Sequence, residues 1–361
     1  MTAVSRFHLE RSLFGDAEKT VATMGDMTAS TFCYPSGVEA LRITNRRGEI
    51  IVLPFKGQQV WSAVFDGRDL TMGSMFDEPV DTRNYLETYG AFFIHCGLTA
   101  IGAPGAEDDH PLHGEIPNAP FRDAILECDG EAGTMTLRSH YQHTKAFACN
   151  YRAEARVMLG ADDTLLDISL AVTNLKRTAM DLMYLGHANF RPVDNGELIY
   201  AAPYDADHVR VRQSIPSHVT PKPGYVEFLA QLAADPSPHH VLRPELAFDP
   251  EVVFTLDMTA DDDGYAHAMQ QHPDGRADYI RFRPHQTPLA TRWICRTADQ
   301  QGLGMAFPST SEVEGYTAEK AKGQFIDLAG GETWRCDIRL GGLDANAAAA
   351  MASHIDQVCG R

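Results

Sequence analysis

Hydrophobic and polar residues alternate with a period of two over much of this chain. Apolar residues occupy every second position from 151 to 157, and the alternation returns from 166 to 172 after a turn at 160–163. Successive side chains of a β-strand point to opposite faces, so this pattern predicts a hairpin with one buried and one wet face. A second hairpin is predicted over residues 41–53, around a turn at 45–48.

The rest of the chain repeats this picture, with Gly, Pro, Asn and Asp between the strands. Further strands are predicted at 59–65, 134–138, 252–258, 279–283 and 334–340. Helical patterns are few and short, at 225–234, 317–322 and 344–358, the last with Asp344 as a plausible N-cap. Many antiparallel hairpins with few helices predict a mainly β protein, a large antiparallel β-sandwich.

The pattern also suggests how the chain is divided. Residues 41–361 are predicted to form one sandwich domain, and residues 1–40 an N-terminal extension packed on the main body. The proline-rich stretch at 216–238 interrupts the strand pattern, which resumes after it. We therefore interpret this stretch as a long excursion or lid rather than as a linker between domains.

Charge and cysteine content narrow the function classes. The 361 residues include 31 Lys and Arg against 49 Asp and Glu, a net charge of −18. Such a surface repels phosphate backbones and anionic lipid, so neither nucleic acid nor membrane is an expected partner. Seven irregularly spaced cysteines, no signal-peptide pattern and no long apolar run favour free thiols and a cytoplasmic location. The oligomeric state stays open, as a monomer or a homo-oligomer.

Three segments place ionisable residues in apolar or glycine-rich surroundings: 92–98, 111–118 and 183–190. His113 precedes Gly114, and His187 follows Gly186. A glycine beside an imidazole allows a tight turn and the close approach of a ligand. Because histidine exchanges protons near neutral pH, these two residues are candidates for proton transfer. The alternative for each is a buried, hydrogen-bonded structural histidine.

Metal-binding patterns are weaker. His-x-x-His occurs at residues 110 and 113 and again at 140 and 143, but neither context supplies further ligands. Residues 261–264 match only a fragment of a calcium loop, so a solvated turn is expected. The main interpretation therefore includes no metal and no cofactor. A metal-assisted isomerase or lyase using His95, His113, His140 and His143 remains a third interpretation.

The same segments carry a family resemblance. His-Cys-Gly-Leu at 95–98, Leu-His-Gly-Glu-Ile at 112–116, Val-Thr-Asn at 172–174 and residues 184–190 follow in a matching order. The chain thus resembles the aldose 1-epimerase (galactose mutarotase-like) superfamily, and most closely its less characterised bacterial branch. The resemblance implies a sugar pocket on the concave face of the sandwich and acid–base chemistry without a metal. It makes His187 the general acid and His113 a second partner of the sugar oxygens.

One departure affects the reaction. The family's glutamate base falls, by match, within 304–310, where Phe307 occupies its place. Phenylalanine accepts no proton but offers a stacking face, so the replacement bases considered are Glu115, Glu312 and Glu314. Further substrate-binding candidates are His95, Asn118, Asn189 and Arg191. The sequence predicts a sugar isomerase or epimerase acting on a small-molecule carbohydrate; the alternative is a non-catalytic sugar-binding or regulatory protein on the same fold.

Overall fold

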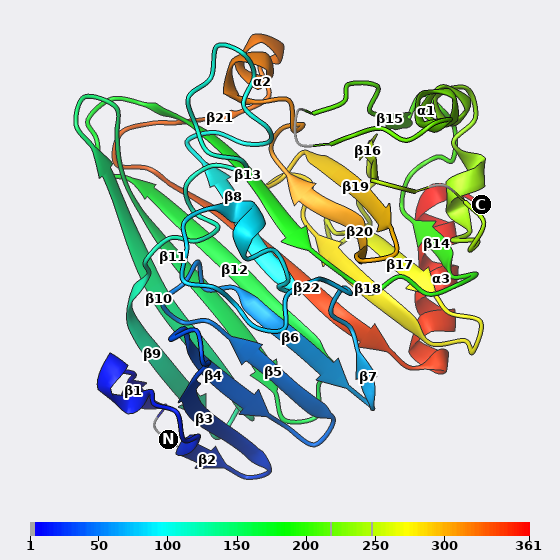
Figure 1. Ribbon diagram of the computed structural model, residues 1–361. Helices are drawn as coiled ribbons and strands as arrows, with labels where there is room; N and C mark the ends of the chain where they lie inside the picture. The colour runs from blue at the N-terminus through cyan, green and yellow to red at the C-terminus, as the bar shows by residue number, and fades with distance from the viewer. Residues whose placement is uncertain (1–3, 217–218, 247) are drawn as a thin grey trace.

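Two large antiparallel sheets make up most of the molecule (Figure 1). The computed structural model describes residues 4–216, 219–246 and 248–361. The buried apolar side chains of both sheets form one continuous core, so the sheets pack face to face. The predicted mainly β sandwich is confirmed.

The first sheet has nine strands in the order β1-β9-β10-β11-β12-β22-β18-β17-β14. Its strands are β1 Ser5–His8, β9 Arg122–Asp129, β10 Thr134–Lys145, β11 Cys149–Gly160, β12 Leu165–Asn174, β22 Thr333–Leu343, β18 Ala277–Phe282, β17 Ala266–Gln271 and β14 Glu197–Tyr200. The hairpin predicted from the alternation at 151–172 is β11 with β12, and its apolar positions are the buried ones.

The second sheet has thirteen strands, and its main path runs β15-β16-β19-β20-β13-β8-β6-β5-β4-β3-β2. These strands are β15 Val209–Val211, β16 Val252–Leu256, β19 Leu289–Arg296, β20 Gln301–Ser309, β13 Met180–Ala188, β8 Phe93–Leu98, β6 Val60–Phe65, β5 Gly48–Val52, β4 Glu39–Thr44, β3 Met27–Cys33 and β2 Lys19–Met24. Two short strands lie off this path, β21 Ile326–Leu328 beside β13 and β7 Arg68–Asp69 beside β6.

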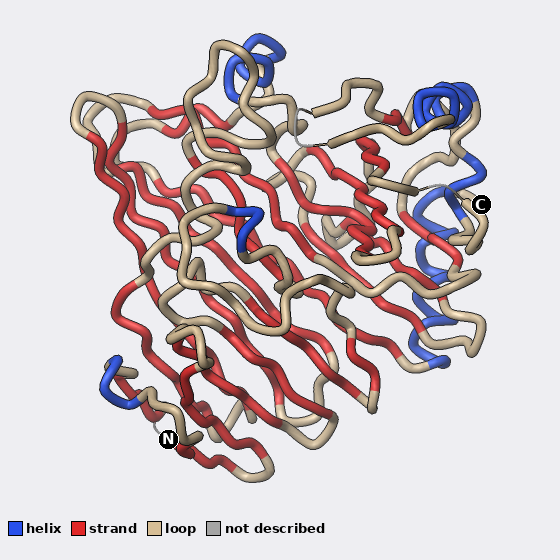
Figure 2. Tube along the Cα trace, viewed as in Figure 1, coloured by secondary structure: helices blue, strands red, loops and turns tan. Residues whose placement is uncertain are grey.

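Helices lie at the periphery of the sheets (Figure 2). They are α1 Tyr225–Ala234, α2 Tyr316–Lys322 and α3 Ala345–Cys359, with single 3-10 turns at Arg11–Leu13, Tyr85–Glu87 and Ser237–His240. All three helices were expected from the sequence, and Asp344 caps α3 by accepting a hydrogen bond from the Ala347 amide at 2.9 Å. No helix within the described ranges is long and apolar enough to cross a membrane.

The first forty residues contribute to both sheets. β1 pairs with β9 in the first sheet, while β2 and β3 form one edge of the second. β3 pairs with β4 along Thr28–Cys33, across the predicted boundary at residue 40. The N-terminal segment is thus hydrogen-bonded into the sandwich and extends it.

Candidate functional site

A cavity of ≈ 480 Å³ lies against β13, β19 and β20 of the second sheet. Connecting segments from six parts of the chain complete its wall. Ring-bearing residues of the lining are Phe76, Tyr85, Tyr89, His113, His187, Trp293 and Phe307. The lining also includes Arg212, Glu251, Thr291, Thr297, Asp299 and Gln300. A volume in this range holds a small ligand, and aromatic walls with few polar groups are typical of ligand pockets.

The period of β13 places His187 in the cavity. Leu185 and His187 line it, while the alternate residues Tyr184 and Gly186 face the first sheet. Tyr184 packs against Trp334 of β22 with ring centroids 5.1 Å apart. At Gly186 a Cβ atom would lie 2.8 Å from the Ile338 side chain, also on β22. One strand therefore contributes alternately to the core and to the site.

Asn189 fixes the orientation of the His187 ring. The Asn189 amide nitrogen donates to the Ala91 carbonyl at 2.9 Å, so its oxygen is turned toward His187. That oxygen lies 2.6 Å from His187 Nδ1, which must therefore carry the proton and donate it. The other nitrogen, Nε2, then presents a lone pair, 3.4 Å from the Tyr89 hydroxyl. The resting ring is an acceptor on its cavity side.

Burial keeps this ring neutral. His187 is 5% exposed, and loss of hydration lowers the pKa of its imidazole to about 3, against a smaller opposite effect of the Asn189 hydrogen bond. Phe307, where the family resemblance expects a glutamate, packs on the ring with centroids 4.1 Å apart. A phenylalanine at this position carries no negative charge that could stabilise a protonated imidazole. The site therefore favours the uncharged form of His187.

The loop at 111–118 brings the second imidazole to the same cavity. The ring centroids of His113 and His187 are 5.6 Å apart, with their planes nearly perpendicular at 85°. Tyr85 packs against His113 at 4.9 Å. The backbone at His113 is left-handed, with φ 58°, and its amide donates to the Gly102 carbonyl at 3.0 Å. A tight, hydrogen-bonded turn thus orients this histidine.

Gly114 makes that turn possible, and its replacement is a direct test. It has φ +76°, and a Cβ atom would lie 2.2 Å from the Gly97 carbonyl oxygen and 2.5 Å from that of Ala100. We expect Gly114→Ala to lower the free energy of unfolding by roughly 2 kcal/mol or more, because backbone atoms cannot move aside cheaply. Chemical denaturation measures the loss. Gly25→Ala is the matched control, since Gly25 has φ +57° but nothing within 4 Å; equal losses in both variants would contradict the packing argument.

Glu251 supplies a carboxylate to the cavity. It precedes β16, and the Trp293 indole nitrogen donates to its Oε2 at 2.8 Å. The same indole ring lies 5.7 Å from the His187 ring, measured between centroids. Trp293 thus contacts both an imidazole and a carboxylate. The backbone carbonyl of Glu251 accepts a hydrogen bond of 2.7 Å from Tyr225 of α1, which anchors the start of the strand.

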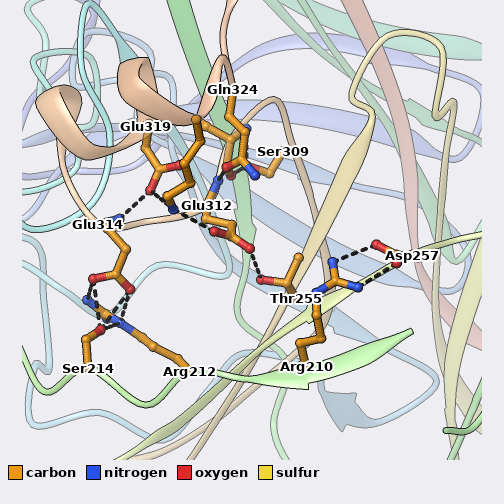
Figure 3. Close-up of polar contacts among 12 residues, drawn as sticks. Arg210, Arg212, Ser214, Thr255, Asp257, Ser309, Glu312, Glu314, Glu319 and Gln324 are labelled. Atoms are coloured by element: carbon orange, nitrogen blue, oxygen red, sulfur yellow. Dashed lines mark hydrogen bonds and ion pairs between the residues drawn. The ribbon is translucent and has the colours of Figure 1, made fainter. Parts of the chain in front are cut away.

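Arg212 brings a positive charge to the lining, but this charge is already paired. Its guanidinium lies 2.6 Å from a carboxylate oxygen of Glu314, and Ser214 donates to the same carboxylate (Figure 3). Glu312 is also engaged, accepting from Thr255 at 3.1 Å and from Lys322 at 2.6 Å. Within the described part of the chain, the lining includes neither Glu312 nor Glu314. The two carboxylates expected as bases are thus engaged in ion pairs beside the cavity rather than in its described lining.

Glu115, the third expected base, also lies outside the lining as far as the described residues show. Its carboxylate accepts hydrogen bonds from the hydroxyls of Tyr151, at 2.5 Å, and Thr99, at 2.6 Å. The backbone amides of Leu98 and Thr99 donate to it as well. The carboxylate therefore stabilises the loop that follows β8. Although Glu115 is two residues from His113, it points toward a different set of partners.

His95 is a core residue. It is fully buried on β8 opposite Gly186, and its Nδ1 lies 2.9 Å from the Tyr184 hydroxyl. It thus faces the first sheet rather than the cavity, which corrects its expected contact with substrate. Burial lowers the pKa of His95 to about 3.

The other three expected binding residues have structural partners. Asn118 accepts from the Gln59 side chain at 2.9 Å, and Arg191 binds the Thr71 carbonyl at 2.9 Å and Asp69 at 2.7 Å. In the described chain neither belongs to the cavity lining. Asn189 orients the ring of His187, which lines the cavity. Asn118 and Arg191 were expected to bind substrate, and the structure gives them structural partners instead, while Asn189 positions His187.

The histidines of the metal interpretation do not gather. His140 lies 3.5 Å from Asp123, and His143 is bonded to Tyr141 at 2.8 Å, both on the first sheet. His110 contacts the Tyr316 amide at 3.2 Å. The four histidines of that interpretation, His95, His113, His140 and His143, therefore lie in separate environments. Of these four, only His113 lines the cavity.

Three important residues of the site were missed in the sequence. Glu251, Trp293 and Arg212 are separated by tens of residues and belong to no motif. A weak signal existed for two of them, since Glu251 directly precedes the strand predicted at 252–258 and Trp293 lies in an apolar run. Their meeting follows from the pairing of β16 with β19, which sets Val253 opposite Trp293. Such pairing is not readable from local patterns.

Comparison with known proteins gives one sequence family and several solved structures with a similar fold. The sequence model of a family described as "Domain of unknown function (DUF4432)" matches residues 35–341. No curated protein sequence matches significantly. A protein from Klebsiella pneumoniae subsp. pneumoniae MGH 78578, named a "putative aldose 1-epimerase", is 18% identical with a TM-score of 0.83, covering 99% of this chain and 96% of its own. A galactose mutarotase-like protein from Clostridium acetobutylicum is 14% identical with a TM-score of 0.61, covering 88% and 99%.

These identities are low, so what the solved structures share with this chain is the fold. That fold is galactose mutarotase-like, as the resemblance in the sequence implied. The reaction has to be argued from the residues of the cavity.

Proposed function

This chain belongs to the DUF4432 family, and we propose that it is a carbohydrate isomerase or epimerase working by proton transfer in the cavity. One observation carries this proposal. Two imidazoles from separate parts of the chain, His113 and His187, meet at 5.6 Å in one aromatic-lined cavity that also contains the Glu251 carboxylate. Paired proton acceptors and donors are what isomerisation of a sugar requires.

The walls of the cavity suit a sugar. The faces of Tyr89, Trp293 and Phe307 can pack on the C–H face of a pyranose or furanose ring, which is apolar. Thr291, Thr297 and Gln300 add neutral hydrogen-bonding groups for hydroxyls. The charge of Arg212 is compensated by Glu314, so the lining offers little to attract a phosphate. A neutral monosaccharide is therefore the expected substrate class.

The state of His187 suggests its part in the reaction. Exchange of anomers requires one group to take the proton of the anomeric hydroxyl and another to give a proton to the ring oxygen; the ring then opens, rotates and closes. With Nδ1 donating to Asn189 and Nε2 bearing a lone pair, His187 begins as the acceptor. This reverses the acid role that the resemblance implied. The protonated ring can return its proton when the sugar closes.

Glu251 and His113 are the proposed partners of His187. Glu251 is held by the Trp293 indole at 2.8 Å, and it supplies a carboxylate although Phe307 replaces the family's glutamate. His113 is the imidazole nearest to His187 in the lining. One of these two groups has to hold the proton that the ring oxygen receives. Both are on different elements from His187, so a ligand can lie between them.

Anomer exchange, followed by NMR magnetisation transfer over a panel of neutral aldoses, tests the proposal. We expect the protein to accelerate exchange of at least one sugar, and Glu251→Gln to lower that rate by roughly 10²-fold or more, because the amide side chain cannot hold and deliver a proton as a carboxylic acid does. Glu245→Gln, at an exposed carboxylate, is the control and keeps the full rate. Activity retained in Glu251→Gln would remove Glu251 from the mechanism.

Binding without turnover is the outcome that favours the alternative, a sugar-binding or regulatory protein. The contact of Phe307 with His187 is the observation in its favour, because a stacking face needs no base. Sugar binding can be followed by the fluorescence of Trp293, one of three tryptophans, with Trp293→Phe identifying its share of the signal. Saturable quenching with no change in anomer exchange for any sugar would select this alternative.

A further inference from the structure

Three potential metal ligands meet away from the cavity, where the C-terminal helix packs on the first sheet. Asp261 lies in the turn before β17, His267 lies in β17, and His354 lies in α3. Figure 1 shows α3 running alongside β14 and β17. A small apolar cluster that includes Ala348 and Ile355 packs this helix on the sheet. The three polar side chains lie beside that contact.

Both imidazoles lie within hydrogen-bond distance of the same carboxylate oxygen. His267 Nε2 is 2.9 Å from Asp261 Oδ2, and His354 Nε2 is 3.2 Å from it. The three atoms all lie within 4.8 Å of one another. In a tetrahedral zinc site with bonds near 2.0–2.1 Å, ligand atoms are separated by about 3.3 Å. The observed spacings are therefore close to those of a coordination sphere.

Hydrogen bonds at their other polar atoms fix the orientation of two of the ligands, Asp261 and His267. Asp261 Oδ1 accepts hydrogen bonds from the amides of Tyr265, at 2.8 Å, and Asp263, at 3.0 Å, which leaves Oδ2 for the histidines. His267 Nδ1 lies 2.7 Å from the Tyr279 hydroxyl. A metal-bound histidine usually has a hydrogen-bond partner at its other nitrogen, and this partner orients the ring.

We propose that Asp261, His267 and His354 bind a divalent transition-metal ion of the zinc class. The ligand set is two imidazole nitrogens and one carboxylate oxygen, which suits zinc, cobalt or nickel better than calcium or magnesium. His354 is 41% exposed at its side chain, so an ion can enter from solvent and keep water in its remaining position. Bound there, the ion joins α3 to the turn before β17.

Nearby charged side chains affect the affinity of the site for a cation. Arg281 and Arg283 stack on the Tyr265 ring at 4.3 and 3.8 Å, so their positive charges lie nearby and weaken cation binding. Asp262 and Asp263, in the same turn as Asp261, offset part of this charge. These opposing charges together set the affinity of the site for a cation.

The competing explanation is a pair of hydrogen bonds, with both Nε2 atoms donating to Asp261. Titration of the metal-free full chain with Co²⁺ separates the two. Metal binding gives a visible d–d absorption band that saturates at one equivalent, and Zn²⁺ then displaces it. With Zn²⁺ at a hundred times its dissociation constant, the melting temperature rises by roughly 3 °C. Hydrogen bonds alone give neither change.

Variants assign the ligands. His354→Ala, at a partly exposed position, keeps the fold and loses both the Co²⁺ band and the thermal shift. Asp261→Asn, which keeps an acceptor oxygen but no charge, weakens Co²⁺ binding at least tenfold. His140→Ala is the control, because His140 lies 3.5 Å from Asp123 in a pair without a third ligand; this variant binds Co²⁺ as the parent does. Absence of binding in the parent, or undiminished binding in His354→Ala, overturns the proposal.

Discussion

Replacement of His187 by glutamine is expected to lower the turnover number for anomer exchange by about 10²–10⁴-fold while sugar binding survives. Glutamine fills much of the volume of histidine and still hydrogen-bonds, but it transfers no proton at neutral pH. The aromatic wall formed by Trp293 and Phe307 stays in place, so affinity changes less than rate. Rates from NMR magnetisation transfer, together with tryptophan fluorescence titrations, measure the two effects separately.

His95→Gln is the matched control for this variant. Both histidines are buried, each has one ring nitrogen bonded to a neighbouring side chain, and they lie on adjacent strands β8 and β13. His95 faces the other sheet, so its replacement affects stability and leaves turnover intact. An equal loss of turnover in both variants would mean that His187 acts through folding, and an unchanged rate in His187→Gln would exclude it from catalysis.

The stability of the fold is expected to decrease steeply as the pH falls below about 6.5. Burial lowers the pKa of His95 and of His187 to about 3, whereas the unfolded chain titrates near 6.5. Between these values the unfolded state binds more protons, so the free energy of unfolding rises with pH and is lost on acidification. Each histidine contributes up to about 1.4 kcal/mol per pH unit in this window.

Urea denaturation at about pH 7 and about pH 5 tests this, since one such histidine accounts for roughly 2 kcal/mol between them. His95→Gln removes one titrating group, so its two free energies of unfolding should differ by about that much less than those of the parent chain. Burial also lowers the pKa of His239 and His240, and the variant therefore keeps part of the pH dependence. An unchanged difference between the two pH values would show that His95 is already protonated in the fold.

The architecture was largely predictable because it depends on local periodicity. The alternation at 151–172 identifies a hairpin and its buried face, and β11 and β12 have that face in the core. The helix at 344–358 was predicted from its alanine content and its Asp344 cap, and α3 differs by one residue at each end. Period and capping are properties of a few neighbouring residues, so they can be recognised in the sequence without knowledge of the whole fold.

The site was predictable only where a residue sits inside a motif. His113 and His187 lie in glycine-containing segments, and the fold brings them together. The carboxylate was sought at Glu115, Glu312 and Glu314. Glu115 is close to His113 in sequence, but its side chain stabilises the loop around Thr99. Glu251 reaches the cavity because β16 pairs with β19, a contact between segments far apart in the chain. Nearness in sequence therefore did not identify Glu251, the carboxylate that strand pairing brings to the same cavity as His187.

The amide at position 189 has a consequence for how tightly His187 retains a proton. A carboxylate in that place would bring a full negative charge to Nδ1 and make the ring a stronger base, slow to let its proton go. The neutral oxygen of Asn189 brings only a dipole, 2.6 Å away. Burial lowers the pKa of His187 and this dipole offsets only part of the effect, so the ring is a weak base whose conjugate acid is strong, and the return of the proton to the sugar is the easier half of a cycle. One exchange of amide for acid would shift that balance without altering the shape of the cavity.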